Sequence, residues 1–590
     1  MIAVVAMGMA LSGCTPGFAN PGGTTTSPAS SGAPLVSASP IEPSPGPLSN
    51  PVPRDGVRQG GTLSLATAEL PKTWNPWGWS PFDLDAVTDL LSPRLFASAA
   101  DGQLHWDPAW LVSDPQVTVS DSGVSGSSSQ GDHTEADAEP SPDPTSTDGV
   151  GAGEPTMTVD YALNPSARWS DGEPVTAADF IATYEACRAL DTPVCRDRGF
   201  DHVTAVVAGV DPHHVQVSYD QVWADWPYTF ARGPIRAQLA GDPVGRDQVW
   251  STPIGHESGL AGPFVPASFD GTTLTLTPNQ FWWGDPVKLE VIRVIAMDPK
   301  LMSWAYLRGQ IDAFMTTDAN VYSQAKQLPG IQTRVSTGVG ARFLVFNRVD
   351  GPLSDPAVRA AVVTALDRAD LGASDLAGLN WDGQLLNSPV WLTSQTQYED
   401  LVLQSGVEPA DLTAAGQLLD EAGWVLGDDG IRAKDGQPLA WDFVVPRDDW
   451  LSENEAFGVR AQLARLGVRL DLTYIESSQV EQVVATGEHG MWASTTRYRT
   501  PIQAAARFAP SGQWGWPESI LGLMTDRAER ELDEVERAKI LTRAAQIVWH
   551  NAPVLPLYET PEILLTRPGL ANFGPNRLGT IWWPNVGWTS

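Results

Sequence analysis

The stretch Ala167–Phe180, with the sequence ARWSDGEPVTAADF, constrains the fold more than any other part of this chain. Its first half predicts a strand end and a turn, with Gly172 where positive φ is easiest. Thr176 is a good helix N-cap, and Asp179 three residues later completes a variant of the capping box. The apolar residues that follow recur at helical spacing: Phe180, Tyr184 and Cys187. The stretch therefore predicts a hairpin-to-helix corner whose helix buries one face.

The stretch Phe343–Arg368 predicts an apolar strand, a turn and a second helix. Asp355 would cap this helix, and Pro356 would occupy its first position, where the missing N–H costs nothing. One face of the helix is apolar and should be buried, through Val358, Ala361, Val362, Ala365 and Leu366.

Two more stretches follow in the C-terminal half. Leu418–Trp424 predicts a helix that ends at Gly423, and a hairpin turning at Asp435-Gly436 comes next. Ala552–Tyr558, with the sequence APVLPLY, predicts a buried strand near the C-terminus.

In this order and at these distances, the four stretches resemble the family 5 solute-binding proteins of ABC importers, which include oligopeptide-, dipeptide- and nickel-binding proteins. The resemblance covers roughly residues 60–588, apart from one insertion. It implies an α/β, two-lobed periplasmic-binding-protein-like fold of class II, the large peptide-binding type, with an extra subdomain in lobe I. It also implies a monomer that closes its lobes over a peptide or another small molecule and delivers it to an ABC permease.

The expected domain limits follow from this resemblance and from local composition. They are 1–14 for the end of a signal peptide, 15–59 for a disordered tether rich in Pro, Ser, Gly and Thr, 60–335 for lobe I, 336–554 for lobe II and 555–590 for the return to lobe I. The lobes should hinge near residues 335–341 and 554–558, with the ligand in the cleft between them.

A subdomain at about 80–220 is expected within lobe I, and it contains a low-complexity insertion at 120–155. The insertion carries eight acidic residues and no Lys or Arg, and strand-like runs flank it at Gln116–Val119 and Thr156–Leu163. A hairpin whose turn was expanded by a disordered segment is the simplest topology, since loop-closure entropy grows slowly with length. A calcium-binding loop is the alternative, although no EF-hand spacing is present.

The N-terminal run MIAVVAMGMALSGC is too short to span a bilayer, where about 20 residues are needed. Leu11–Cys14 resembles a bacterial lipobox, which predicts that Cys14 is lipidated and that the protein is held on the outer face of the cell membrane by this anchor alone. The signal lacks its positive n-region, so we expect the true start to lie upstream of Met1. The alternative is a cytoplasmic protein with an apolar N-terminus.

The net charge of −33 argues against a nucleic-acid partner, because a polyanion would be repelled. Apart from Cys14, the chain has two cysteines, Cys187 and Cys195, and outside the cytoplasm a disulfide between them is favoured. Two unpaired buried thiols are the alternative.

No catalytic motif, cofactor motif or zinc spacing is present, so the sequence favours a binding protein over an enzyme. The adjacent histidines His213 and His214 follow Asp211-Pro212, which favours a surface turn over a metal site. Two other classes stay open: a secreted carbohydrate-active enzyme that uses tryptophans as sugar platforms, and a structural or sensory lipoprotein.

Tryptophan is abundant, with 24 residues, and most of these should be core residues. Two loop clusters could present ring faces to a ligand instead, through Trp77 and Trp79 in one and Trp514 and Trp516 in the other. Resemblance to the family adds Asn347 as a candidate for a strand contact with the ligand.

Peptide-binding members of the family carry an aspartate in a motif resembling W-x-x-D-Y-x-x-P, and it pairs with the ammonium of the peptide. Here Tyr498 and Pro501 keep the spacing, while the tryptophan is displaced and Arg497 takes the place of the aspartate. A guanidinium repels an ammonium and favours a carboxylate, a phosphate or sugar hydroxyls. Arg497, with Arg499 nearby, therefore predicts a site that is atypical for peptides with free amino termini. The alternative is that Arg497 pairs with a carboxylate of the protein.

Overall fold

The computed structural model describes residues 36–40, 49–71, 74, 82–92, 94–122, 153–189, 195, 199–240, 252–254, 259–405, 410–487, 489–497, 500–510, 512, 514 and 519–589. Within these ranges, no helix combines the length and the apolar composition that crossing a membrane requires.

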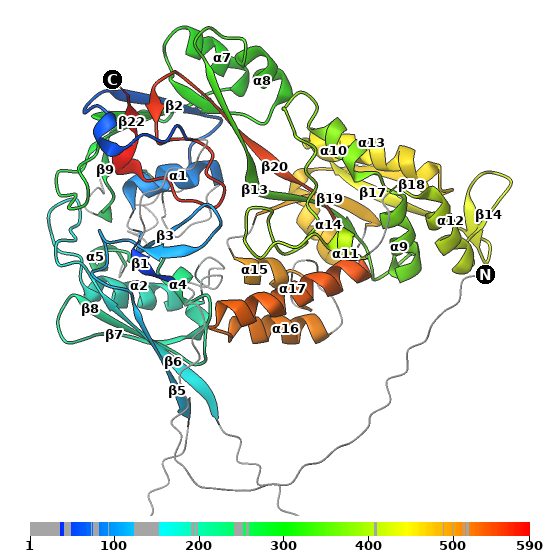
Figure 1. Cartoon of the computed structure of the whole chain (residues 1–590), viewed down its shortest axis with the longest axis horizontal. Coiled ribbons are helices and arrows are strands. Elements are labelled where there is room, and N and C mark those ends of the chain that lie inside the picture. The colour runs from blue at the N-terminus through cyan, green and yellow to red at the C-terminus, as the bar shows by residue number, and fades with distance from the viewer. Residues whose placement is uncertain are drawn as a thin grey trace, which may run out of the picture.

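A mixed sheet of ten strands runs through the whole molecule (Figure 1). Its strands are, in spatial order, β18 (Arg469–Ile475), β17 (Ala440–Pro446), β19 (Met491–Arg497), β13 (Gln332–Phe346), β20 (Val554–Thr566), β12 (Ala313–Met315), β2 (Thr62–Thr67), β11 (Val291–Ala296), β10 (Thr273–Pro278) and β9 (Phe264–Phe269). We call the part around β2 and β9–β12 lobe I and the part around β17–β19 lobe II.

The long strands β13 and β20 join the two lobes. They pair antiparallel over most of their 15 and 13 residues, and nearly all of β20 and the second half of β13 are buried. Their register shifts between Thr337 and Phe343, which lies opposite Pro556. The expected strands at Phe343–Asn347 and Ala552–Tyr558 are therefore parts of longer elements that serve both lobes.

Lobe I also contains two smaller sheets and most of the N-terminal half of the chain. One sheet holds β5 (Gln116–Ser122), β6 (Gly153–Ala162), β8 (His214–Tyr219) and β7 (Val203–Ala208), and the other holds β1 (Val36–Pro40), β4 (Leu104–Trp106) and β3 (Phe96–Ser98). The helices are α1 (Phe82–Leu91), α2 (Ala177–Ala189), α4 (Trp226–Thr229), α5 (Ala237–Ala240), α7 (Pro299–Leu307) and α8 (Ala319–Ala325), and a short sheet pairs β21 (Leu570–Ala571) with β22 (Gly587–Trp588).

The predicted hairpin-to-helix corner is confirmed. Gly172 has a φ of 94°, and α2 begins directly after Thr176. The Asp179 carboxylate accepts hydrogen bonds from the Thr176 and Ala237 backbone N–H groups, at 2.9 and 2.8 Å, and from the Trp169 indole at 3.3 Å. Asp179 is buried, so these three donors replace water and fix the corner.

The predicted hairpin around the acidic insertion is confirmed as well, and its strands run further than expected. β5 and β6 pair antiparallel from Gln116↔Asp160 to Ser122↔Gly153. Residues 123–152 lie outside the described ranges.

Lobe II surrounds its part of the large sheet with helices. They are α9 (Pro356–Ala365), α10 (Arg368–Asp375), α11 (Leu401–Ser405), α12 (Leu412–Glu421), α13 (Trp450–Ala464), α14 (Val480–Thr486), α15 (Pro501–Ala506), α16 (Ser519–Glu529) and α17 (Glu534–Asn551), and a three-stranded sheet holds β14 (Val425–Leu426), β15 (Arg432–Lys434) and β16 (Gln437–Pro438).

The local signals in this lobe are confirmed. The Asp355 side chain caps α9 by accepting a hydrogen bond from the Ala357 N–H at 2.9 Å, and the predicted apolar face of the helix is buried. Gly423 follows α12 with a φ of 86°. Asp435 and Gly436 turn the β15–β16 hairpin with φ values of 51° and 78°, as a two-residue loop of this kind requires.

Part of the expected tether differs from the prediction. Residues 49–59 pack on the C-terminal segment, where Val57 is buried and forms a bridge with Thr589, and Val52 exchanges hydrogen bonds with the Asn572 side chain. Val36–Pro40 pairs with β4 as a strand. Val57 supplies the apolar contact that a fully disordered segment lacks.

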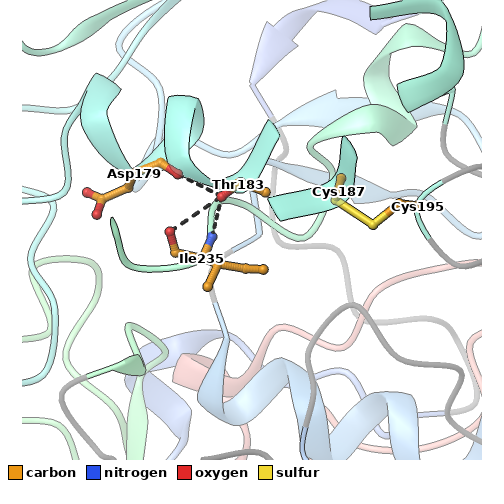
Figure 2. Close-up of a disulfide and its surroundings, with 5 residues drawn as sticks. All are labelled: Asp179, Thr183, Cys187, Cys195 and Ile235. Atoms are coloured by element: carbon orange, nitrogen blue, oxygen red, sulfur yellow. Dashed lines mark hydrogen bonds between the residues drawn. A yellow bond between two sulfur atoms is a disulfide. The ribbon is translucent and has the colours of Figure 1, made fainter. Parts of the chain in front are cut away.

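Cys187 and Cys195 form a disulfide, the pairing that the sequence favours (Figure 2). It ties the last turn of α2 to the chain beyond it, and its Cα atoms lie 5.5 Å apart. One turn earlier on the same helix, the Thr183 hydroxyl donates to the Asp179 carbonyl at 2.7 Å and accepts from the Ile235 N–H at 2.7 Å. Both cysteines are buried, so the disulfide is part of the lobe I core.

Replacing both Cys187 and Cys195 with serine should lower the free energy of unfolding by about 2–3 kcal/mol, because the crosslink restricts a short loop of the unfolded chain. Urea unfolding with and without reductant measures this. Reductant should destabilise the wild-type protein and leave the double variant unchanged. Equal responses of the two proteins would contradict a disulfide in the native state.

Candidate functional site

The centre of the large sheet is the part that both lobes share. Here β13 forms a bulge between Thr337 and Ala341: three residues of β13 lie opposite a single residue of β20, Thr560. The Thr560 hydroxyl donates to the Gly340 carbonyl at 3.1 Å, and a Cβ atom at Gly340 would collide with that hydroxyl. Glycine is therefore needed for the close approach of the two strands at this point.

Arg497 lies beside this bulge. It is the last residue of β19, it pairs with Gly340 across the sheet, and its side chain is exposed. Its Nε atom lies 3.6 Å from the position that a Cβ of Gly340 would take, so the side chain passes over the glycine. The Arg507 guanidinium donates to the Arg497 carbonyl at 2.6 Å and fixes the end of the strand. Arg497 is thus held at the junction of the lobes, next to solvent.

A buried carboxylate lies on the opposite side of the bulge. Glu559 accepts hydrogen bonds from the Thr393 backbone N–H at 2.6 Å and from the Thr393 hydroxyl at 2.9 Å. Burial raises the pKa of Glu559, and the bonds from Thr393 partly offset this effect. Glu559 thereby ties β20 to the loop of lobe II that precedes α11.

A second buried network attaches the long strands to lobe II. The Arg342 guanidinium binds both oxygens of Glu455, at 2.8 and 2.5 Å, and also donates to the hydroxyls of Ser452 and Thr495. Burial raises the pKa of Glu455, and the Arg342 charge lowers it. Because Arg342 is on β13 and Glu455 is on α13, the pair joins the shared sheet to a helix of lobe II.

The hydroxyl of Tyr558, on β20, donates to Asp375 at 3.0 Å, and Asn454 donates to the other oxygen of this carboxylate at 2.7 Å. Burial raises the pKa of Asp375 to about 7, and the nearby Glu455 charge adds to the effect. Both long strands are therefore bound to lobe II helices by buried polar contacts.

Two of the predicted ligand-binding residues have partners inside the protein. The Asn347 amide donates to the carbonyls of Gly487 and His489, at 3.0 and 2.7 Å, and its oxygen accepts from the Val349 N–H. These bonds hold the loop before β19, and contact of Asn347 with a ligand stays a prediction.

Trp514 is buried against the rings of Phe343 and Phe508, with centroids 5.3 and 5.5 Å away. This packing makes Trp514 part of a lobe II core, as expected for most tryptophans. Its Nε1–H has no hydrogen-bond partner among the described residues, and its ligand contact also stays a prediction.

The other predicted site residues lie outside the described residues: Cys14, Trp77, Trp79, Tyr498, Arg499 and Trp516.

The histidine pair lies at a surface turn, as predicted: His213 is in the turn and His214 begins β8. The Asp211 carboxylate accepts from the His213 N–H at 2.8 Å and contacts the His214 ring at 3.0 Å. In the described part of the chain, no group of three or more His, Cys, Asp and Glu residues is arranged to hold a metal ion.

Sequence reasoning missed the buried charges around the shared strands. Arg342 precedes the strand that was expected to begin at Phe343, and Glu455 lies 113 residues further along the chain. The alternation of buried and exposed positions in the first half of β13 is a weak signal that Arg342 is buried. No local pattern in the sequence marks Glu455, Asp375 or Glu559 as its neighbours.

Comparisons with known proteins agree with this architecture. Residues 152–515, more than half of the chain, match the model of the bacterial extracellular solute-binding proteins, family 5. The oligopeptide-binding protein OppA of Mycobacterium tuberculosis is 27% identical over 454 residues, which are 73% of this chain and 74% of that protein.

Two solved structures share the fold. One is the periplasmic EDTA-binding protein EppA, with a TM-score of 0.72 and 21% identity, over 92% of this chain and 98% of that one. The other is the oligopeptide-binding protein AppA from Bacillus subtilis in complex with a nonapeptide, with a TM-score of 0.65 and 16% identity, over 90% of this chain and 100% of that one.

Proposed function

Because the chain belongs to the family 5 bacterial extracellular solute-binding proteins, we propose that it captures peptides between its two lobes and delivers them to an ABC permease. The observation that carries the proposal is the shared pair of strands, β13 and β20, whose register shifts where the lobes meet. Such a junction lets two lobes close over a ligand without breaking either core. The similarity to OppA of M. tuberculosis, an oligopeptide-binding protein by name, supports peptides as the ligand class.

The proposed lobe limits are those expected from the sequence: 60–335, with a subdomain at about 80–220, and 555–590 for lobe I, and 336–554 for lobe II. The hinge would lie at the bulge between Thr337 and Phe343 and at the facing residues Pro556–Pro561. Gly338 and Gly340 favour this position, because residues without a Cβ absorb backbone rotation most easily.

The proposed anchor is a lipid on Cys14, which would hold a monomer outside the cell membrane near its permease. Labelling of growing cells with a fatty-acid analogue tests this. Incorporation into the wild-type protein and its loss in Cys14→Ser would support the anchor, and equal labelling of both would contradict it.

We further propose that Arg497 contacts an anionic or hydroxyl-rich part of the ligand. Its exposed side chain lies at the junction of the lobes, on a strand that Arg507 fixes. A guanidinium there attracts a peptide carboxylate and repels a free ammonium. A non-peptide anion or an oligosaccharide is the second candidate, and the similarity in fold to a protein named for binding EDTA, a polycarboxylate, favours the anion.

Arg497→Asp should increase the affinity for peptides with free amino termini about tenfold relative to the same peptides after N-acetylation, because the charge at the contact is reversed. Calorimetric titration of a defined peptide pool and its acetylated counterpart measures the ratio. Arg543→Asp is the matched control, since Arg543 is exposed on α17 and its guanidinium donates to Gln546 in the same helix. A wild-type preference for free amino termini would contradict the proposed role of Arg497.

A further inference from the structure

Away from the shared strands, the lobes touch a second time, where the segment before α4 meets α15–α17. Figure 1 shows the ends of α16 and α17 next to α4. The Ala224 N–H donates to the Glu529 carbonyl at 2.6 Å, and the Thr500 hydroxyl donates to the Asp225 carboxylate at 2.8 Å. Residues 225 and 500 are 275 positions apart in the sequence, so both bonds connect distant segments.

The segment around Ala224 contributes to two different cores. Trp223 and Trp226 pack in the lobe I core of the four-stranded sheet. Ala224, between them, packs in a different apolar cluster, with residues of β13, α15 and α17. Among the described residues, every other buried member of that cluster lies at Val339 or later in the chain. In the other direction, Leu532 of lobe II packs against the lobe I core. The two lobes therefore interlock here.

This contact lies close in the sequence to Arg497, the proposed ligand contact. Thr500 follows directly on residues 497–499 and caps α15, where its hydroxyl accepts from the Gln503 N–H at 3.1 Å. Arg507, immediately after the same helix, donates to the Arg497 carbonyl. Arg497, which lies beside the bulge of the shared strands, and Thr500, which binds Asp225, are thus three positions apart in the sequence.

We propose that Asp225 and Thr500 form a latch that engages when the lobes close and that, through α15 and Arg507, holds Arg497 against the ligand. The proposal rests on the proposed function, since it assigns residues that stabilise the closed state of a binding protein. Asp225 is a positioning residue here: it binds Thr500 and acts on the ligand through α15, Arg507 and Arg497. A ligand that favours the closed state would strengthen the latch, and the latch would in turn slow release of the ligand.

The charges around the latch make its strength depend on pH. Arg537 of α17 and Glu529 of α16 face Asp225, while Asp526 and Arg530 face Glu529. Arg537 is also close to Glu531, Glu534 and Tyr228. Every one of these groups lies on α16, α17, the turn between them or α4, the elements that pack around the contact.

Burial raises the pKa of Asp225 to about 6, although the Thr500 bond and the Arg537 charge lower it. Burial also raises the pKa of Glu529 to about 7, and the Asp526 and Asp225 charges add to this. In the open state both carboxyls are solvated and titrate near their ordinary values. The closed state therefore binds protons more tightly, and acid favours closure.

Hydrogen exchange in the ligand-free full chain tests the latch without knowledge of the ligand, so its outcome is independent of whether peptides bind. The amide of Ala224 is protected only while it donates to Glu529, which makes its protection factor a measure of the closed-to-open ratio. We expect protonation of Asp225 to raise this protection factor about tenfold between pH 7.5 and 5.0, and protonation of Glu529 to raise it further.

Asp225→Ala should lower the protection of Ala224 about tenfold or more at pH 7.5 and leave α9 as protected as in the wild-type protein. Asp225→Asn combined with Glu529→Gln should raise the protection at pH 7.5 to the level that the wild-type protein reaches at pH 5.0, and should abolish its pH dependence. Asp220→Asn is the matched control, because Asp220 is exposed on the same segment and pairs with His202 within lobe I. Unchanged protection in Asp225→Ala would overturn the latch, and so would an equal loss of protection in α9, since Asp225 would then stabilise the whole fold.

Discussion

Arg342→Met should lower the free energy of unfolding by about 3–5 kcal/mol, one of the two largest effects that we expect from a single substitution in this chain. Arg342 and Glu455 are both buried and form two hydrogen bonds, at 2.8 and 2.5 Å. Removing the guanidinium leaves a buried carboxylate without its counter-charge, and breaking such a pair is far more harmful than replacing it whole. Denaturation by urea, followed by circular dichroism, measures the loss.

Two comparisons make this prediction specific. The double variant Arg342→Met/Glu455→Leu should recover most of the lost stability, because two apolar side chains need no counter-charge. Lys539→Ala should leave the urea midpoint unchanged, because the Lys539–Glu536 pair is exposed. A double variant as unstable as Arg342→Met would contradict the account.

The loss of stability in Arg342→Met, relative to the wild-type protein, should also depend on pH. Burial raises the folded-state pKa of Glu455, and without Arg342 the opposing effect disappears. A group whose folded pKa is raised contributes its stability at low pH and loses it as pH rises through that value. The variant should therefore lie closer to the wild-type protein at pH 5 than at pH 8.

Trp169→Ala should lower the free energy of unfolding by about 3–5 kcal/mol, because it opens a large cavity in the lobe I core. Trp169 has an exposed fraction of 1% and donates to the buried Asp179. The hairpin-to-helix corner depends on that carboxylate, so the loss combines apolar burial with one hydrogen bond.

Thermal unfolding of three variants separates these contributions. Trp169→Phe keeps much of the aromatic ring and leaves Asp179 its two backbone donors. It should therefore lose less than half as much stability as Trp169→Ala. Trp304→Ala is the matched control, because Trp304 has an exposed fraction of 49% on α7, and its loss should be below about 1 kcal/mol. A loss of the same size for Trp304→Ala and Trp169→Ala would contradict the assigned burial.

Local signals in the sequence predicted local structure well. The Asp355 cap, the glycine after α12 and the Asp435-Gly436 turn depend on residues within a few positions of each other, and all three are confirmed. The family resemblance supplied the two-lobed fold, which periodicity alone could not, because strand order depends on contacts between distant segments.

The candidate site was less predictable, for the same physical reason. Arg342 meets a carboxylate 113 residues away, and Asp225 meets a hydroxyl 275 residues away. A buried charge looks like a surface charge in a sequence until the fold places its partner beside it. Residues 49–59 are an apolar counterpart of the same problem. Their composition predicted a disordered tether, but the fold buries Val57 against the C-terminal segment.

The most direct test of the central claim is mass spectrometry of the full protein, purified gently and without unfolding, to identify what is bound between the lobes. We expect a mixture of short peptides that is released on denaturation and in which Arg497 has enriched peptides with acidic residues or blocked amino termini. A single sugar or a single non-peptide metabolite in place of peptides would contradict peptide capture.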